Sequence, residues 1–190
     1  MLIGLTGNAG CGKTTIINYI KEKFPKITTI ESDKLIKKWS ESEIGSGLLQ
    51  QLRGNLSQYD FKIKIFKDDR LRAIIEDESL KYILPILDGY KESEDIIIFE
   101  SAIIIEKRLT HLFNSIILVT CNKKLQINRL KRRNWSKQLI KLVLRKQIKT
   151  IFKKITSNFI INTDNYLKAC SDIEDILKTI TKDIQEDKKC

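Results

Sequence analysis

The chain has 190 residues, of which 42% are hydrophobic and 31% charged, a balance typical of a folded globular protein rather than a disordered one. This length fits one α/β domain with a core of useful size and excludes a second full domain. No run approaches the roughly 20 apolar residues that cross a bilayer, so we expect no membrane-spanning segment.

The four cysteines are scattered without the CxxC spacing of a zinc site, and they predict no disulfide framework. We therefore expect the chain to work in the reducing cytoplasm. The net charge of +11 suits a nucleic acid, an acidic membrane surface or a polyphosphate substrate. Because lysine, isoleucine and asparagine recur throughout, as in proteins of AT-rich genomes, we expect neither a nucleic acid nor a membrane partner.

The N-terminal part of the chain predicts two strands, each followed by a helix. Residues 2–6 form an apolar run typical of a buried strand, and residues 13–24 carry apolar side chains at helical spacing up to a proline. A second strand over 26–30 delivers Glu31 and Asp33 to its carboxyl end, where open α/β sheets bind their ligands. Residues 34–39 predict the next helix.

The middle of the chain predicts a helical region and then two buried strands. Residues 40–89 are polar and helical in pattern, with three glycines and no convincing strand, as expected of an inserted substrate-binding region. Residues 95–99 and 115–120 are continuous apolar runs, typical of central parallel strands. Glu100 lies at the exit of the first of them.

The C-terminal third is basic and mostly helical. A helical pattern over 125–155 has a predicted break at 134–136, and a short strand over 159–161 ends in Asn162. An amphipathic helix over 172–184 closes the chain, and we expect the tail from residue 185 to be frayed. The order of these elements predicts a doubly wound α/β fold with a parallel sheet.

Residues 7–14, Gly-Asn-Ala-Gly-Cys-Gly-Lys-Thr, match the P-loop pattern between a strand and a helix. Its glycines allow a tight turn in which successive N–H groups point at phosphate oxygens. Lys13 adds a positive charge for the β- and γ-phosphates, and Thr14 a hydroxyl for Mg²⁺, at the positive end of a helix. The alternative, a chance match without a nucleotide, is disfavoured by the flanking strand and helix. We expect ATP to be bound by Gly7, Gly10, Cys11, Gly12, Lys13, Thr14 and Thr15.

Acidic residues at the strand ends distinguish a kinase from a hydrolase or a switch. Asp33 lies opposite the cradle, where it could accept a proton from an attacking hydroxyl or help to hold Mg²⁺. Its alternative role is a helix N-cap. Glu100 is a candidate for orienting Mg²⁺ through water, and its alternative is an ordinary exposed glutamate.

Arginines of the basic stretch are candidates for a lid that closes over the phosphates and stabilises the transferring group. Most of the neighbouring lysines indicate a solvated helix face instead. We therefore divide a single P-loop kinase domain into a core (1–39, 90–122 and 156–184), a helical substrate region (40–89) and a lid (123–155). The lid candidates are Arg129, Arg132, Arg133 and Arg145.

Placed in this order, the motifs resemble the dephospho-CoA kinase family over nearly the whole chain. Residues 3–15 are similar to the family's opening strand and P-loop, residues 31–34 to its Asp-Ala-Asp element, and residues 99–106 to its Asp-x-Pro-Leu-Leu-x-Glu segment. A more specific similarity is the run Gln126-x-x-Arg129-Leu-x-x-Arg133, which Gln147 and Ile-Ile-Asn162 follow.

This resemblance implies transfer of the γ-phosphate of ATP to the ribose 3′-hydroxyl of dephospho-CoA. It implies that Asp33 is the base, that Lys13 and Thr14 serve ATP and Mg²⁺, and that Arg133 acts from the lid. It also implies substrate-binding roles for Glu31, Glu100 and Arg129, and a nucleotide-binding role for Asn162.

The sequence departs from the family pattern on the acceptor side. Glu31 and Glu100 stand where the family has aspartate, Ala102 where it has proline, and Gln58 where it usually has arginine. The expected His-Pro pair is absent from 76–85. Two alternatives therefore stay open, namely another small P-loop kinase acting on a nucleoside or nucleotide, and a degenerate nucleotide-binding module.

Overall fold

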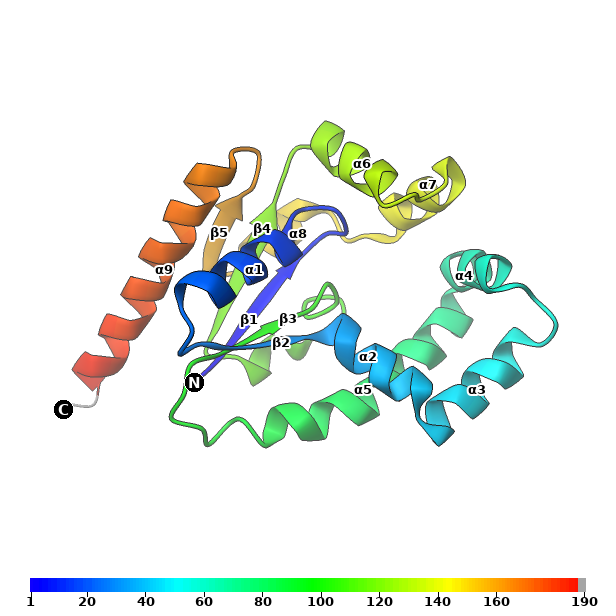
Figure 1. Ribbon diagram of the computed structural model, residues 1–190, viewed down its shortest axis with the longest axis horizontal. Coiled ribbons are helices and arrows are strands. Elements are labelled where there is room, and N and C mark those ends of the chain that lie inside the picture. Colours follow the sequence, from blue (N-terminus) through cyan, green and yellow to red (C-terminus); the bar gives the residue numbers. More distant parts are fainter. Residues whose placement is uncertain (188–190) are drawn as a thin grey trace.

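The computed structural model describes residues 1–187, with side chains through residue 181. Within this range the chain forms a sheet of five parallel strands (Figure 1). The spatial order of the strands is β2-β3-β1-β4-β5. Their bounds are Leu2–Gly7 for β1, Thr28–Glu31 for β2, Ile97–Glu100 for β3, Ser115–Thr120 for β4 and Phe159–Asn162 for β5. The predicted α/β fold with a parallel sheet is confirmed.

Helices cover both faces of the sheet, as the doubly wound prediction requires. Helices α1 (Lys13–Lys23) and α9 (Tyr166–Asp187) pack on one face, against Ile3 and Leu5 of β1. On the other face, Leu2 packs with α5 (Asp69–Asp88) and with the segment that ends in a 3₁₀ turn at Leu109–Leu112. Alternate residues of β1 therefore enter different cores, because successive side chains of a strand point to opposite faces.

Four helices and no strand lie between β2 and β3. They are α2 (Ser32–Glu41), α3 (Glu43–Arg53), α4 (Gln58–Lys67) and α5. In Figure 1, α3 and α4 extend away from the sheet, whereas the C-terminal half of α5 packs against it. Side-chain oxygens cap three of these helices at their first turns: those of Ser42 on α3, Ser57 on α4 and Asp68 on α5. The assignment of 40–89 as a substrate-binding region stays a prediction.

The basic stretch contains three helices, α6 (Lys123–Arg132), α7 (Lys137–Lys146) and α8 (Thr150–Ile155). The predicted break at 134–136 is confirmed: Asn134 has a left-handed backbone with φ of 58°, and the Ser136 hydroxyl accepts a hydrogen bond from the first turn of α7. A second break, over 147–149, was not predicted. It turns α8 back against β4 on the far side of the sheet in Figure 1.

Several predicted boundaries were wrong by a few residues. Strand β2 begins at Thr28 rather than at residue 26, and α2 begins at Ser32 rather than at residue 34. Helix α9 begins at Tyr166 rather than at residue 172 and continues to Asp187, so residues 185–187 extend the helix. Residues 188–190 of the expected frayed tail lie outside the described residues. No helix within the described residues is long and apolar enough to cross a bilayer.

Candidate functional site

The phosphate cradle follows β1, and its glycines adopt conformations that other residues avoid. Gly7, Gly10 and Gly12 have φ values of 154°, 80° and 93°, a region that favours glycine because it lacks a Cβ. A Cβ on Gly7 would overlap the Val119 carbonyl of the neighbouring strand, and Gly12 stands at the N-cap of α1. The cradle therefore packs closely against β4 and ends at the N-terminus of α1, which carries a positive partial charge.

Side chains from the C-terminal third of the chain donate hydrogen bonds to carbonyl groups of the cradle. The Thr163 hydroxyl donates to the Cys11 carbonyl at 2.7 Å, and Arg129 Nη1 donates to that hydroxyl at 2.8 Å. Gln126 Nε2 donates to the Ala9 carbonyl at 2.8 Å and to the Gln147 side chain at 3.1 Å. Because two carbonyls of the cradle are held in this way, its conformation depends on these distant contacts.

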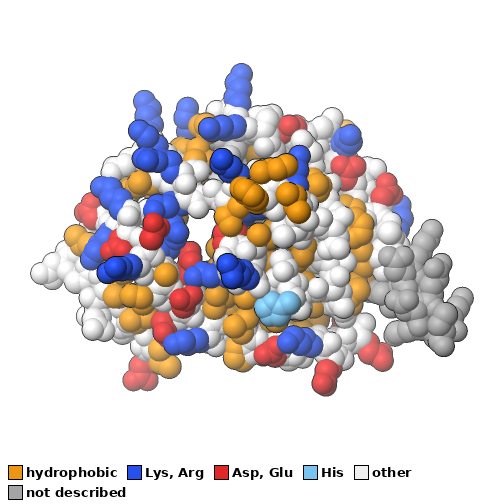
Figure 2. Space-filling model, turned by 180° about the vertical axis from the view of Figure 1, so that it is seen from behind, with side chains coloured by type: hydrophobic (Ala, Val, Ile, Leu, Met, Phe, Trp, Pro, Cys, Tyr) orange, Lys and Arg blue, Asp and Glu red, His pale blue; other side chains and the backbone are white. Residues whose placement is uncertain are grey.

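A cavity of about 570 Å³ opens beside the cradle. Its lining brings together residues that lie far apart in the sequence, including predicted site residues of the cradle, β2–α2, β3 and the lid. Seen from behind, basic and acidic side chains gather around a hollow in the surface (Figure 2). The predicted site residues on the cavity wall are Lys13, Asp33, Glu100 and Arg133.

Glu100 ends β3 inside the site and is only 6% exposed. The alternative of an ordinary exposed glutamate is therefore wrong. Its Oε1 lies 3.4 Å from Lys13 Nζ. Burial raises the pKa of Glu100, the negative charge of Asp33 acts in the same direction, and Lys13 opposes them. The pair places an acid directly beside the lysine of the cradle.

Asp33 lies in the first turn of α2, not at its N-cap. Because α2 begins at Ser32, the cap position is Glu31. The Glu31 side chain makes no capping hydrogen bond. The capping alternative for Asp33 is therefore not observed. Asp33 instead lines the cavity together with Lys13 and Glu100.

Glu31 is held by lysines rather than placed on the cavity wall. Its Oε1 lies 2.5 Å from Lys21 Nζ and 2.9 Å from Lys34 Nζ. Burial would raise the pKa of Glu31, but hydrogen bonds from these two lysines outweigh it and hold the pKa below its ordinary value. The structure thus separates Glu31 from Asp33, although the sequence places them two residues apart.

The other predicted site residues lie around the cavity rather than in its wall. Arg129 is bound to Thr163 at the edge of the cradle, and Arg145 lines a separate hollow beside α4. Thr14 and Thr15 are exposed at the start of α1. Asn162 is exposed at the end of β5, where its side chain accepts a hydrogen bond from the Asp164 backbone at 2.7 Å.

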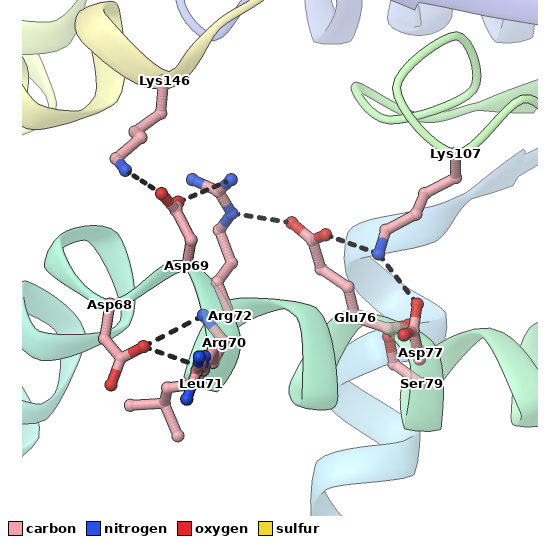
Figure 3. A network of polar contacts seen from close by, with 10 residues as sticks. All are labelled: Asp68, Asp69, Arg70, Leu71, Arg72, Glu76, Asp77, Ser79, Lys107 and Lys146. Carbon is pink, nitrogen blue, oxygen red and sulfur yellow. Dashed lines mark hydrogen bonds and ion pairs between the residues drawn. The ribbon is translucent and has the colours of Figure 1, made fainter.

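A network of ion pairs forms the wall opposite the cradle, which we call the acceptor wall (Figure 3). Lys146 of α7 lies 2.5 Å from Asp69, and Arg72 lies 3.1 Å from Asp69 and 3.5 Å from Glu76. Lys107, from the segment after β3, lies 2.9 Å from Glu76. Sequence reasoning missed all of these residues, because no motif links three segments so far apart.

A buried ion pair underlies the same wall. Lys153 of α8 is 1% exposed, and its Nζ lies 2.6 Å from Glu106 and 3.2 Å from the Ala102 carbonyl. Burial lowers the pKa of Lys153, and the negative charge of Glu106 opposes that shift. Lys153 was missed as well, since in the sequence it is one of many lysines on a basic helix.

Helix α4 packs against α7 beside the cavity. Ile63 packs with Leu139 and Val143 of α7. The Tyr59 hydroxyl donates to Ser136 at 2.8 Å. These contacts connect the region between β2 and β3 with α7, so that the cavity lies between them.

The family model and several curated relatives indicate one family. Residues 1–169 match the family model described as dephospho-CoA kinase. A dephospho-CoA kinase of Fusobacterium nucleatum is 24% identical over 96% of this chain and 96% of its own, and one of Streptococcus agalactiae is 28% identical over 87% and 91%. The solved dephospho-CoA kinase from Campylobacter jejuni has a TM-score of 0.63 at 18% identity and covers 95% of this chain and 97% of its own. At that identity the structural likeness shows the fold alone.

Proposed function

Because the chain belongs to the dephospho-CoA kinase family, we propose that it transfers the γ-phosphate of ATP to the ribose 3′-hydroxyl of dephospho-CoA, giving CoA and ADP. The family match carries this proposal. The structure supports it, because Lys13, Asp33 and Glu100 line the same cavity. A volume of about 570 Å³ falls within the range of small-molecule sites.

The cradle supports the ATP half of the reaction. Its N–H groups and the start of α1 suit the phosphates, and Lys13 supplies the charge for the transferring group. The oxygen donors of Thr14, Asp33 and Glu100 fit Mg²⁺, a hard cation that takes one or two protein ligands beside substrate phosphates. When bound, Mg²⁺ neutralises charge on the phosphate oxygens.

Asp33 supports the proton transfer. A ribose hydroxyl that attacks the γ-phosphate must lose its proton, and a carboxylate on the wall beside the cradle is positioned to accept it. Glu100 pairs with Lys13 and so holds the lysine at the phosphate end of the cavity. Arg133, which reaches the cavity from the end of α6, adds positive charge near the transferring group.

The acceptor wall supports binding of an acceptor that carries a diphosphate. Arg72, Lys107 and Lys146 bring positive charge to the wall opposite the cradle, and Asp69 and Glu76 hold them in fixed positions. Dephospho-CoA joins its adenosine to the pantetheine arm through a diphosphate. Its ribose can then face Asp33 while its diphosphate lies against these cations. We further propose that the protein acts in the cytoplasm on small molecules alone.

A coupled assay of ADP release tests the proposal. The purified chain, ATP and Mg²⁺ are combined with dephospho-CoA, or with a panel of nucleosides and nucleoside monophosphates. We expect ADP release that depends on dephospho-CoA. Release with nucleosides or nucleotides alone would favour the other small kinases, and ATP binding without release for any acceptor would favour a degenerate module.

A further inference from the structure

Two cysteines of different segments meet at the phosphate cradle. Strands β1 and β4 are neighbours, with Gly7 paired to Val119, so the residues that follow each strand emerge side by side. Cys11 lies in the cradle and Cys121 directly follows β4. Their sulfur atoms are 3.3 Å apart, and both thiols are free.

The surroundings give the two thiols different chemistry. The hydrogen bond from Cys121 and the charges of Lys13 and Arg129 lower the pKa of Cys11 to about 7, although burial opposes this shift. The hydrogen bond to Cys11 and burial raise the pKa of Cys121. Cys11 thus has thiolate character at neutral pH, and Cys121 is a thiol poised beside it.

We propose that Cys11 and Cys121 form an oxidation site, at which a hydroperoxide converts the thiol pair into a disulfide that disables the phosphate cradle. The arrangement has a cysteine with a lowered pKa and a resolving cysteine beside it, as in redox sensors, although Cys11 is only 5% exposed. This inference concerns ATP binding, so it does not depend on the identity of the acceptor.

The reaction balances with hydrogen peroxide as the oxidant. The Cys11 thiolate attacks one peroxide oxygen, the O–O bond breaks, and the products are a sulfenic acid on Cys11 and, after protonation of the leaving hydroxide, water. The Cys121 sulfur then attacks the Cys11 sulfur and forms the S–S bond. The S–O bond of the sulfenic acid breaks, and the hydroxide leaves as the second water with the proton of the Cys121 thiol. Two thiols are oxidised and one peroxide is reduced.

The disulfide would displace the cradle. An S–S bond is about 2.05 Å long, so the sulfurs must approach each other by roughly 1.2 Å from their present 3.3 Å. Cys11 stands two residues before Lys13, in a loop whose backbone must fit phosphate. Because the contacts weakened are hydrogen bonds from the cradle to charged phosphate, we expect ATP affinity to fall roughly 10- to 100-fold.

The test treats the full chain with hydrogen peroxide and follows two quantities together. Peptide mapping by mass spectrometry detects a disulfide between Cys11 and Cys121, and titration calorimetry measures ATP affinity. We expect the disulfide to form as ATP affinity falls, and dithiothreitol to reduce the disulfide and restore ATP affinity. Absence of the disulfide, or a disulfide with unchanged ATP affinity, would overturn the proposal, and neither result needs a variant.

Two serine variants separate this site from other thiols. Cys121→Ser should bind ATP normally before oxidation and form no disulfide at Cys11, so that excess peroxide oxidises Cys11 to the sulfinic acid, which dithiothreitol does not reverse. Cys170→Ser, the matched control for a buried cysteine on α9, should respond to peroxide like the unchanged chain. A reversible loss in Cys121→Ser equal to that of the unchanged chain would contradict the proposal. Circular dichroism establishes whether each variant is folded. If Cys121→Ser does not fold, Cys121→Ala takes its place in the test.

Discussion

The phosphate cradle comes from one continuous segment, residues 7–14, whereas the acceptor wall combines side chains of α5, α7 and the segment after β3. The cradle owes its shape to its backbone conformation, and Thr163 and Gln126 hold two of its carbonyls. In the acceptor wall, partly exposed ion pairs set the positions of the charges. One region therefore depends on local steric constraints, and the other on tertiary structure.

This difference predicts which substrate each region controls. Changes at the cradle should affect ATP, changes at the acceptor wall should affect the acceptor, and a change at Asp33, between them, should affect turnover itself. The predictions that follow test this separation, beginning with the largest expected effect.

Asp33→Asn should lower turnover with dephospho-CoA by about 1,000-fold, because an amide does not accept the proton of the attacking hydroxyl. The Michaelis constant for ATP should change little. Steady-state kinetics checks both quantities, with Asp88→Asn, an exposed change at the far end of α5, as the control. Unchanged turnover would remove Asp33 from the mechanism.

Lys153→Met should lower the free energy of unfolding by about 3 kcal/mol, because it leaves Glu106 without its partner beneath the acceptor wall. Glu106 retains some access to solvent, so we expect the lower end of the range for broken buried pairs. The double variant Lys153→Met/Glu106→Leu should recover most of the loss. Urea unfolding measures all three proteins, and an equal loss in the double variant would show that the unpaired Glu106 carboxylate is not the cause of the destabilisation.

Arg72→Ala should raise the Michaelis constant for dephospho-CoA about tenfold, or roughly 1.4 kcal/mol, and leave that for ATP unchanged. The reason is the loss of one cation from the acceptor wall. Arg70→Ala is the matched control, because Arg70 lies on the same helix, is exposed and is not part of the cavity lining. A parallel rise in the constant for ATP would contradict the separation of the two regions.

Glu31→Gln should have the smallest effect, a loss of about 0.5–1 kcal/mol in the free energy of unfolding at pH 7. The lysines hold the pKa of Glu31 below its unfolded value, so its contribution is present above about pH 4.3 and lost as the pH falls through the lower folded pKa. Unfolding experiments from pH 7 down to strongly acidic pH should show the difference between the two proteins disappearing. A difference that persists at acidic pH would have another cause.

The sequence predicted those features of the molecule that depend on local pattern. The apolar runs of β3 and β4 and the glycines of the cradle are recognisable because burial and backbone sterics act on neighbouring residues. The positions of Glu31 and Arg129 were harder to predict. The motif of each residue is present in the sequence. In the structure, however, Lys21 and Lys34 bind Glu31, and Thr163 binds Arg129.

The acceptor wall and the cysteine pair lay beyond sequence reasoning for a different reason. Lys107 and Glu76 become neighbours only when α5 packs beneath β3, and Cys121 reaches Cys11 only because β4 is next to β1. Strand order and helix packing are properties of the whole fold. No periodicity or spacing within one segment reports them.

The identity of the product tests the central proposal most directly. Phosphorus NMR of a reaction with ATP, Mg²⁺ and dephospho-CoA should show a new phosphomonoester on the ribose 3′-oxygen, formed in equal amount with ADP. Its rate of formation should fall about 1,000-fold in Asp33→Asn. ADP formed at the same rate while dephospho-CoA stays unmodified, or a phosphate attached to another oxygen, would contradict the proposed function.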